Sequence, residues 1–152
     1  MSTKFFWDEI RLIQSGIPSM LKLSKRTEYG LIAIRHIAAE PVRITTAKEI
    51  ADRYKIPYEL LAKVMQKLAK RGLIVSHQGV YGGYTLAMGA GELSISTIIN
   101  AIEGQLPAIT QCIADSPDSC SIYDNCTIKN PLGKIQLNIE QVFKTMKLSE
   151  IV

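Results

Sequence analysis

The residues in this sequence that are best suited to chemistry are three cysteines. Cys112, Cys120 and Cys126 lie within a stretch of 15 residues, and the rest of the 152-residue chain has none. Thiolates are soft ligands that suit zinc or iron–sulfur clusters, and a flexible loop can wrap three of them around one centre. The spacing alone is equally consistent with three unligated thiols.

The histidines do not complete a zinc site near these cysteines. The chain has 2 histidines, His36 and His77, and both lie far from the cysteines in sequence. We expect an ordinary helical residue at His36 and a hairpin residue at His77, so a local Cys3His site is not predicted. No base accompanies the thiols, and we find no Ser/His/Asp set and no phosphate-binding glycine loop. We therefore predict that the protein is not an enzyme.

Composition and charge indicate a globular protein with a polyanionic partner. The chain is 47% hydrophobic and 21% charged, which is enough apolar material for the core of one domain. Residues 1–91 hold 14 Lys and Arg against 7 Asp and Glu, a net charge of +7, whereas residues 92–152 hold 4 against 7, a net charge of −3. The basic half suggests nucleic acid. The alternative is a solvated basic face with no partner.

Residues 1–19 are expected to be an extension outside the domain. They contain charged residues and no clean apolar core of a secretory signal, and no apolar run in the chain reaches the roughly 18–20 residues that span a membrane. An odd number of cysteines argues against a disulfide framework. We therefore expect a cytoplasmic protein without membrane contact.

The elements that must position these residues follow from helical and strand periodicity. Ser24 is expected to cap a helix that ends at Pro41, and residues 42–45 are expected to be extended. Thr46 and Glu49 have the capping-box spacing that starts a short helix. A further helix is predicted over 57–71, with Pro57 in its first turn.

The second half of the chain alternates a hairpin, a helix, a loop and a last helix. Strands are predicted over 73–78 and 84–87, joined by a glycine-rich turn. Ser94 is expected to cap a helix that ends at Gly104, and residues 105–130 are interpreted as a loop. Pro131 is expected to open a helix whose apolar stripe can face a partner; the stripe is Ile135, Ile139, Val142, Phe143 and Met146.

This order of elements is typical of a winged helix–turn–helix. In that interpretation the 57–71 helix enters a DNA major groove with its first residues at base edges, and the hairpin tip lies over the backbone or the minor groove. Residues 53–71 hold six Lys and Arg and a single acidic residue, Glu59, which suits phosphate contact. The alternative is a tri-helical core with a hairpin that does not touch DNA.

The chain resembles the Rrf-two (Rrf2) family of bacterial winged-helix transcription regulators. The motifs that carry the resemblance are LSKRTEYG at residues 23–30, IPYELLAKVMQKL at 56–68, GGYTLA at 82–87 and ISTIINAIEG at 95–104. The resemblance covers the chain from about residue 20 to its end. It implies a homodimer built around a long C-terminal helix that crosses to the other subunit.

The resemblance also implies a cofactor, because many family members hold an iron–sulfur cluster on three loop cysteines. Here the first gap has seven residues and no histidine follows Cys126 closely, so the spacing is more similar to the iron-responsive branch than to the cluster-biogenesis branch. In the nitric-oxide branch an acidic residue of the partner's first helix supplies a fourth ligand, and Glu28 matches that position. The alternative for Glu28 is a solvated carboxylate at a helix start. Gln78 stands where the cluster-biogenesis type has arginine.

The sequence therefore predicts a mainly α (α+β) fold, a winged helix–turn–helix with a long C-terminal dimerisation helix. We divide it into an extension (1–19), a DNA-binding region (20–90), and a cluster loop with dimerisation helix (91–152). The predicted function is a homodimeric transcriptional repressor whose operator affinity is set by a 2Fe–2S or 4Fe–4S cluster that responds to iron, cluster supply, nitric oxide or redox state. A zinc-stabilised or cluster-free DNA-binding dimer is the alternative. Predicted cluster ligands are Cys112, Cys120, Cys126 and Glu28; predicted DNA contacts are Ser24, Lys25, Tyr29, Thr46, Pro57, Tyr58, Glu59, Lys63, Gln78 and Gly79.

Overall fold

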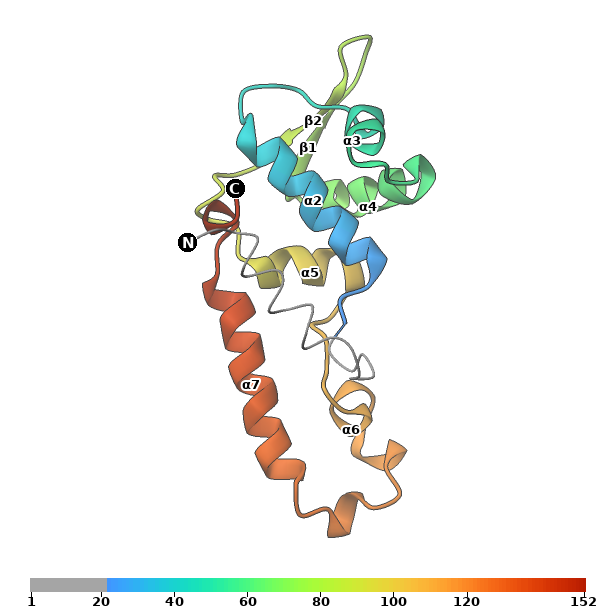
Figure 1. The fold of residues 1–152 in the computed structure, drawn as a ribbon, viewed down its shortest axis with the longest axis vertical. Helices are drawn as coiled ribbons and strands as arrows, with labels where there is room; N and C mark the ends of the chain where they lie inside the picture. The colour runs from blue at the N-terminus through green and yellow to red at the C-terminus, as the bar shows by residue number, and fades with distance from the viewer. Residues whose placement is uncertain (1–21) are drawn as a thin grey trace, which may run out of the picture.

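A helical head and a long C-terminal helix make up residues 22–152, the part of the chain that this computed structural model describes (Figure 1). The predicted extension, residues 1–19, lies outside this range. Within the described residues, no helix is long and apolar enough to cross a membrane. The head contains three helices and the hairpin; the helices are α2 (Lys25–Ala39), α3 (Ala47–Tyr54) and α4 (Tyr58–Lys70). Helix α5 (Ile95–Glu103) crosses beneath the head, and α7 (Lys129–Thr145) runs away from it beside the segment that carries the cysteines.

The first two helices of the head begin at the residues predicted to cap them. Helix α2 spans Lys25–Ala39, and the Ser24 hydroxyl accepts a hydrogen bond from the Thr27 amide at 3.2 Å. Helix α3 spans Ala47–Tyr54, and the Thr46 hydroxyl accepts from the Glu49 amide at 3.1 Å. In a complete capping box the Glu49 carboxylate would also accept from the Thr46 amide. Here it forms an ion pair with Arg43 at 2.8 Å instead.

The helix predicted over 57–71 is α4, which spans Tyr58–Lys70. Pro57 is its N-cap and precedes the first turn instead of lying in it. The turn from α3 into α4 contains Lys55 in the left-handed conformation, with φ of 56°. The buried face of α4 is formed by the predicted apolar residues Leu61, Val64, Met65 and Leu68.

Helices α2, α4 and α5 cross closely, and Gly30 makes this possible. A Cβ atom at Gly30 would overlap the Ile102 side chain of α5 and would lie 3.0 Å from Val64 of α4. The crossing buries one continuous core that extends past residue 90 into α5. Its largest fully buried side chains are Ile34, Ile37, Ile50, Leu61, Val64, Met65, Leu68, Leu93, Ile98, Ile99, Ile102 and Leu148.

The wing is a two-stranded antiparallel sheet of β1 (Ile74–His77) and β2 (Gly83–Leu86), with Ile74 opposite Leu86. The extended segment predicted at 42–45 contributes a single bridge, Thr45 to Tyr84, because residues 41–43 form a turn. The two glycines before Tyr84 are required by close backbone contacts. A Cβ at Gly82 would lie 2.5 Å from the His77 carbonyl, and one at Gly83 would lie 2.8 Å from the Thr45 carbonyl.

Helix α5 spans Ile95–Glu103, between Ser94 and Gly104 as predicted. The predicted loop 105–130 is wrong in detail, since it contains α6 (Gln111–Ala114) and two short 3-10 helices, Pro117–Ser119 and Tyr123–Asn125. Two local turns therefore interrupt the loop just before Cys120 and Cys126.

Helix α7 spans Lys129–Thr145, so it begins two residues before Pro131 and ends before Met146. A proline within the first turn removes only an amide that has no helical partner, so Pro131 does not mark the start. A last 3-10 helix, Leu148–Glu150, returns to the head, where the Leu148 amide donates to the Leu93 carbonyl at 2.8 Å.

The predicted apolar stripe of α7 divides between two faces. Ile139 and Phe143 are half-buried and line an apolar groove with Leu23 and Pro107 of the same chain. Other exposed apolar residues lie on the helix and at its N-cap, Ile128. Three of them recur every seven residues: Ile128, Ile135 and Val142 are 55%, 49% and 56% exposed. The face that is free to meet a partner is therefore narrower than the predicted stripe.

Candidate nucleic-acid interface and cysteine loop

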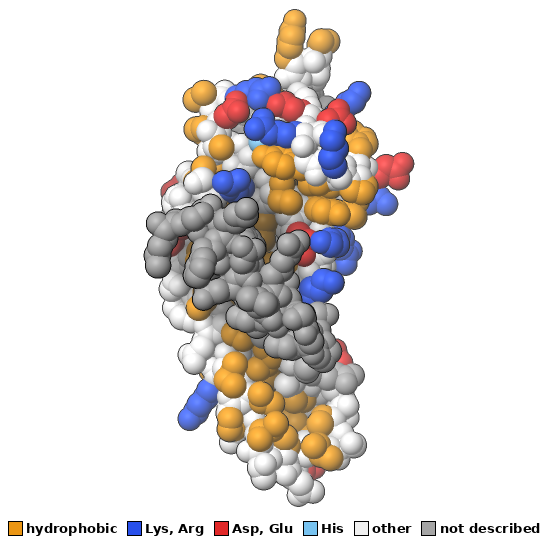
Figure 2. Space-filling model, in the orientation of Figure 1, with side chains coloured by type: hydrophobic (Ala, Val, Ile, Leu, Met, Phe, Trp, Pro, Cys, Tyr) orange, Lys and Arg blue, Asp and Glu red, His pale blue; other side chains and the backbone are white. Residues whose placement is uncertain are grey.

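The first turns of α4 present polar side chains away from the core. Tyr58, Glu59 and Lys63 are exposed, whereas the opposite face of the helix is buried. Figure 2 shows Lys and Arg side chains gathered over the head, while the far end of the visible face is mostly hydrophobic and uncharged. The exposed face of α4, which is predicted to contact base edges, is thus free to enter a DNA major groove.

The tip of the wing is strongly exposed and partly apolar. Gln78 and Gly79 are exposed as predicted. Val80 and Tyr81, which sequence analysis did not single out, are 96% and 90% exposed. The sequence could have indicated this, because an aromatic residue between the glycines of a turn lies too far from the core to be buried. The tip can therefore be inserted into a groove or packed against a sugar–phosphate backbone.

The residues predicted at the start of α2 already have partners within the chain. The Lys25 ammonium pairs with the Glu28 carboxylate at 2.5 Å. Tyr29 is half-buried and packs against the core. The Ser24 hydroxyl donates to Glu103. Of the ten predicted DNA contacts, Tyr29 is the one that is not exposed.

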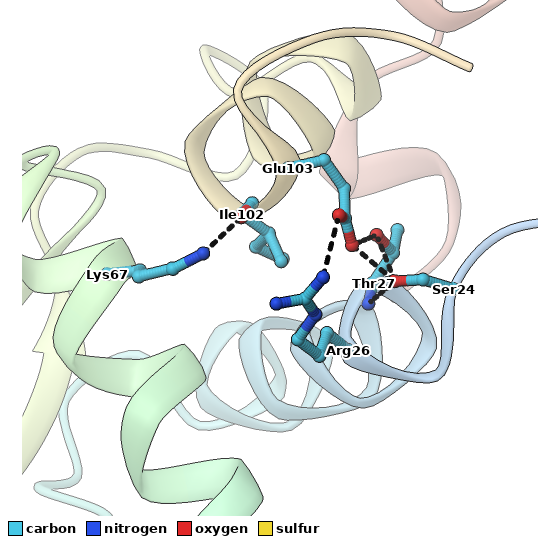
Figure 3. Close-up of polar contacts among 6 residues, drawn as sticks. All are labelled: Ser24, Arg26, Thr27, Lys67, Ile102 and Glu103. Atoms are coloured by element: carbon cyan, nitrogen blue, oxygen red, sulfur yellow. Dashed lines mark hydrogen bonds and ion pairs between the residues drawn. The ribbon is translucent and has the colours of Figure 1, made fainter. Parts of the chain in front are cut away.

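Glu103, the last residue of α5, is the centre of a polar group that sequence analysis missed (Figure 3). One carboxylate oxygen accepts from the Ser24 hydroxyl and from the Thr27 hydroxyl, the latter at 2.8 Å. The other lies 3.6 Å from the Arg26 guanidinium. We call Ser24, Arg26, Thr27 and Glu103 the Glu103 cluster.

The charge of Glu103 is stabilised by its neighbours. Burial alone raises the pKa of this carboxyl, but the hydrogen bonds from Ser24 and Thr27 and the charges of Arg26 and Lys67 outweigh it and hold the pKa below its ordinary value. Lys67 of α4 lies next to this group, and its ammonium donates to the Ile102 carbonyl at 2.8 Å. Three helices are therefore joined at one polar junction.

The three cysteines are spread along the segment between α5 and α7, at the end of the molecule away from the wing (Figure 1). Cys112 is in α6, and Cys120 and Cys126 each follow directly after a 3-10 helix. All three are half-buried free thiols, and the Cys112 sulfur lies 3.3 Å from the Thr110 hydroxyl. Over residues 22–152, no three His, Cys, Asp or Glu side chains are grouped closely enough to hold a metal ion.

The donor set fits an iron–sulfur cluster by its chemistry, since it supplies three half-buried free thiols, the soft ligands that iron in such clusters takes. Glu28 is not among these cysteines in one protomer, because it pairs with Lys25 at the start of α2. Its predicted role requires the second subunit.

Gln136 fastens the segment that leads to the cysteines, and sequence analysis missed it as well. It is the buried residue of α7, at 4% exposure. Its side-chain oxygen accepts from the Ile109 amide and its nitrogen donates to the Pro107 carbonyl, each at 3.0 Å. A lone glutamine in a helix gives no local sequence signal for such a role.

A helix–turn–helix followed by a two-stranded wing, with the outer face of the second helix free, defines a winged helix–turn–helix regulator. More specifically, the chain belongs to the Rrf2 family, whose model, described as "Iron-dependent Transcriptional regulator", matches residues 23–152. The predicted resemblance and fold are confirmed.

Named relatives agree with this assignment. The chain is 32% identical over 131 residues to a protein of Aquifex aeolicus (strain VF5) that is named as an HTH-type transcriptional regulator, covering 85% of this chain and 90% of the relative. It is 28% identical over 133 residues to the HTH-type transcriptional regulator NsrR of Shouchella clausii, covering 87% and 89%. Among solved structures, T. potens IscR superposes with a TM-score of 0.67 at 26% identity, covering 86% of this chain and 85% of IscR. The protein is a transcriptional regulator and not an enzyme, as predicted.

Proposed function

We propose that this protein is a repressor that reads its operator with the start of α4 and the tip of the wing. The observation that carries the proposal is the free outer face of α4, where Tyr58, Glu59 and Lys63 are exposed. Helix starts in this motif reach base edges, and lysines neutralise phosphates. The remaining contacts come from flanking positions: Ser24, Lys25, Tyr29, Thr46, Pro57, Gln78 and Gly79.

The regulator acts as a homodimer through α7. Ile128, Ile135 and Val142 recur at seven-residue intervals and are exposed, which is the pattern of a helix that packs along a second helix. A dimer also suits an operator with two half-sites, because each subunit then presents one α4 helix. In functional terms, residues 20–90 read DNA and residues 91–152 hold the cluster loop and the dimer contact.

Cys112, Cys120 and Cys126 hold an iron–sulfur cluster, with Glu28 of the partner subunit as the fourth ligand. When bound, a cluster supplies a centre whose presence or oxidation state depends on iron, cluster supply, nitric oxide or redox conditions. The chain's own contribution is to fix residues 105–128 in one arrangement, since three side chains spread over that segment must converge. The predicted operator affinity then depends on which arrangement the segment adopts.

A cluster-free regulator is the second candidate, and one observation favours it. The thiols are not gathered around a point within a single chain. This arrangement favours unligated thiols, and such a protein is colourless, as a zinc-stabilised dimer would also be. Anaerobic purification with a visible spectrum and iron and sulfide analysis separates the two, because a cluster-bearing protein is brown.

The DNA-binding part is tested by salt dependence on a duplex selected from random-sequence DNA by the wild-type protein. Each phosphate contact contributes about −0.9 to the slope of log affinity against log salt. Lys63→Ala should weaken binding and reduce the slope by about 1 unit, whereas Lys134→Ala on α7 should change neither. An unchanged slope in Lys63→Ala contradicts the proposed orientation of α4.

A further inference from the structure

The Glu103 cluster lies where the helices that read DNA meet the segment that carries the cysteines. Glu103 ends α5, and its carboxylate holds Ser24 and Thr27 at the start of α2. Its neighbour Ile102 accepts the hydrogen bond from Lys67 of α4 at 2.8 Å. The end of α5 is therefore tied to both helices by polar contacts, in addition to the apolar packing around Gly30.

The same helix end leads directly into the cysteine segment. Gly104 caps α5 in the left-handed conformation, with φ of 87°, and Cys112 follows eight residues later. Between them, Pro107 and Ile109 are held by Gln136 of α7. The connection from Glu103 to Cys112 is therefore short, and hydrogen bonds to α7 hold it at Pro107 and Ile109.

We propose that Glu103 is a positioning residue that transmits the arrangement of the cysteine segment to the start of α2 and to α4. This inference rests on the proposed function. Hydrogen bonds to a charged group are strong and directional, so they are lost when the acceptor moves by a fraction of their length. When Glu103 is displaced, its hydrogen bonds from Ser24 and Thr27 break. Ile102 moves with it, and its hydrogen bond from Lys67 shifts α4. The two α4 helices of a dimer then change their separation, to which DNA affinity is sensitive.

Lys67 has a defined part in this inference. Although it lies on α4, its ammonium is engaged by the Ile102 carbonyl of α5. Lys70, one turn further on, is exposed, and its ammonium has no hydrogen bond or ion pair with other residues in the range 22–152. Lys67 and Lys70 can therefore be replaced as a matched pair on one helix. Only Lys67 contacts the end of α5.

The test uses the full-length protein, with and without anaerobically reconstituted cluster, on the duplex selected by the wild type. The ratio of the two dissociation constants measures the coupling between cluster and DNA. Glu103→Gln should bind the same amount of iron and sulfide as the wild type, while its ratio falls to within about twofold of unity. Lys67→Met should reduce the ratio as well. Glu150→Gln, which makes the same charge change at an exposed site, and Lys70→Met should keep the wild-type ratio.

A second readout does not depend on the cluster. In the metal-free wild type, alkylation of the three thiols with N-ethylmaleimide should change the hydrogen-exchange rates of the amides of residues 25–30. In Glu103→Gln the same alkylation should leave those rates unchanged, and Thr27→Val, which keeps the side-chain shape, should behave likewise. A purely structural role for Glu103 alters both states equally and leaves the response to alkylation intact.

The outcomes separate the inference from the proposed function. A wild type that binds no iron, or whose DNA affinity ignores the cluster, overturns the proposed function, and the exchange experiment still decides the role of Glu103. A Glu103→Gln variant that retains the wild-type ratio and the wild-type exchange response overturns the inference alone.

Discussion

Gln136 of α7 holds the backbone of Pro107, with its side-chain nitrogen 3.0 Å from the Pro107 carbonyl oxygen. This contact joins the helix proposed to form the dimer to the segment that leads from the head to the cysteines. Because the same side chain also accepts from the Ile109 amide, one buried residue secures two backbone groups on that segment.

Replacing Gln136 by leucine should therefore destabilise the protein. The Ile109 amide and the Pro107 carbonyl would lose their partners, and an unsatisfied buried polar group costs about 1–3 kcal/mol. Urea denaturation followed by circular dichroism measures the change. Gln141→Leu, at an exposed position of the same helix, serves as the control and should change stability by less than about 0.5 kcal/mol. Equal effects of the two substitutions would contradict the role given to Gln136.

Two glycine-to-alanine substitutions should change the free energy of unfolding in opposite directions. Gly30→Ala places a methyl group against Ile102 and Val64, and such overpacking costs about 1–3 kcal/mol. Gly133 in α7 has no neighbour within 4 Å of the position of an added Cβ among the described residues, so Gly133→Ala should raise the free energy of unfolding by up to about 1 kcal/mol. Thermal and urea unfolding check both variants. A stabilised Gly30→Ala would mean that the three helices do not cross as described.

The dimer should depend on the exposed heptad face of α7. Ile135→Asp together with Val142→Asp places two charges on that face and should yield monomers by light scattering, with loss of binding to the selected duplex. Ile139 is a poor choice for this test, because it lines a groove within its own chain. Leu137→Asp, at another exposed position of α7, should remain dimeric. A folded double variant that stays dimeric places the interface elsewhere.

Glu28 should control the lifetime of the cluster and not its assembly. A carboxylate is a harder and weaker iron ligand than a thiolate, so Glu28→Ala should assemble a cluster that is more labile to chelator and has a changed visible spectrum. Lys25→Met is the matched control, since it removes the partner that pairs with Glu28 in one protomer but removes no ligand. Unchanged spectrum and lifetime in Glu28→Ala would exclude the ligand role and direct the search to water, a small thiol or a nearby aspartate.

Much of the fold could be predicted because its signals are local. Ser24, Thr46 and Ser94 cap helices within three residues of themselves, and the apolar face of α4 repeats at helical spacing. The missed features join residues that are distant in sequence. Glu103 meets Thr27 across 76 positions, and Gln136 meets Ile109 across 27. Neither residue type marks its partner in advance, so these contacts emerge only from packing.

We propose that an iron–sulfur cluster on Cys112, Cys120 and Cys126 sets the affinity of this regulator for DNA. The most direct test is an anaerobic titration of the selected duplex, followed by fluorescence anisotropy, with wild-type protein and with Cys120→Ala, each before and after reconstitution with iron and sulfide. We predict that reconstitution turns the wild type brown and changes its dissociation constant by about tenfold or more, equivalent to about 1.4 kcal/mol. Cys120→Ala should bind little iron and show one affinity throughout. A wild-type affinity that is the same with and without iron and sulfide would mean that no cluster controls DNA binding.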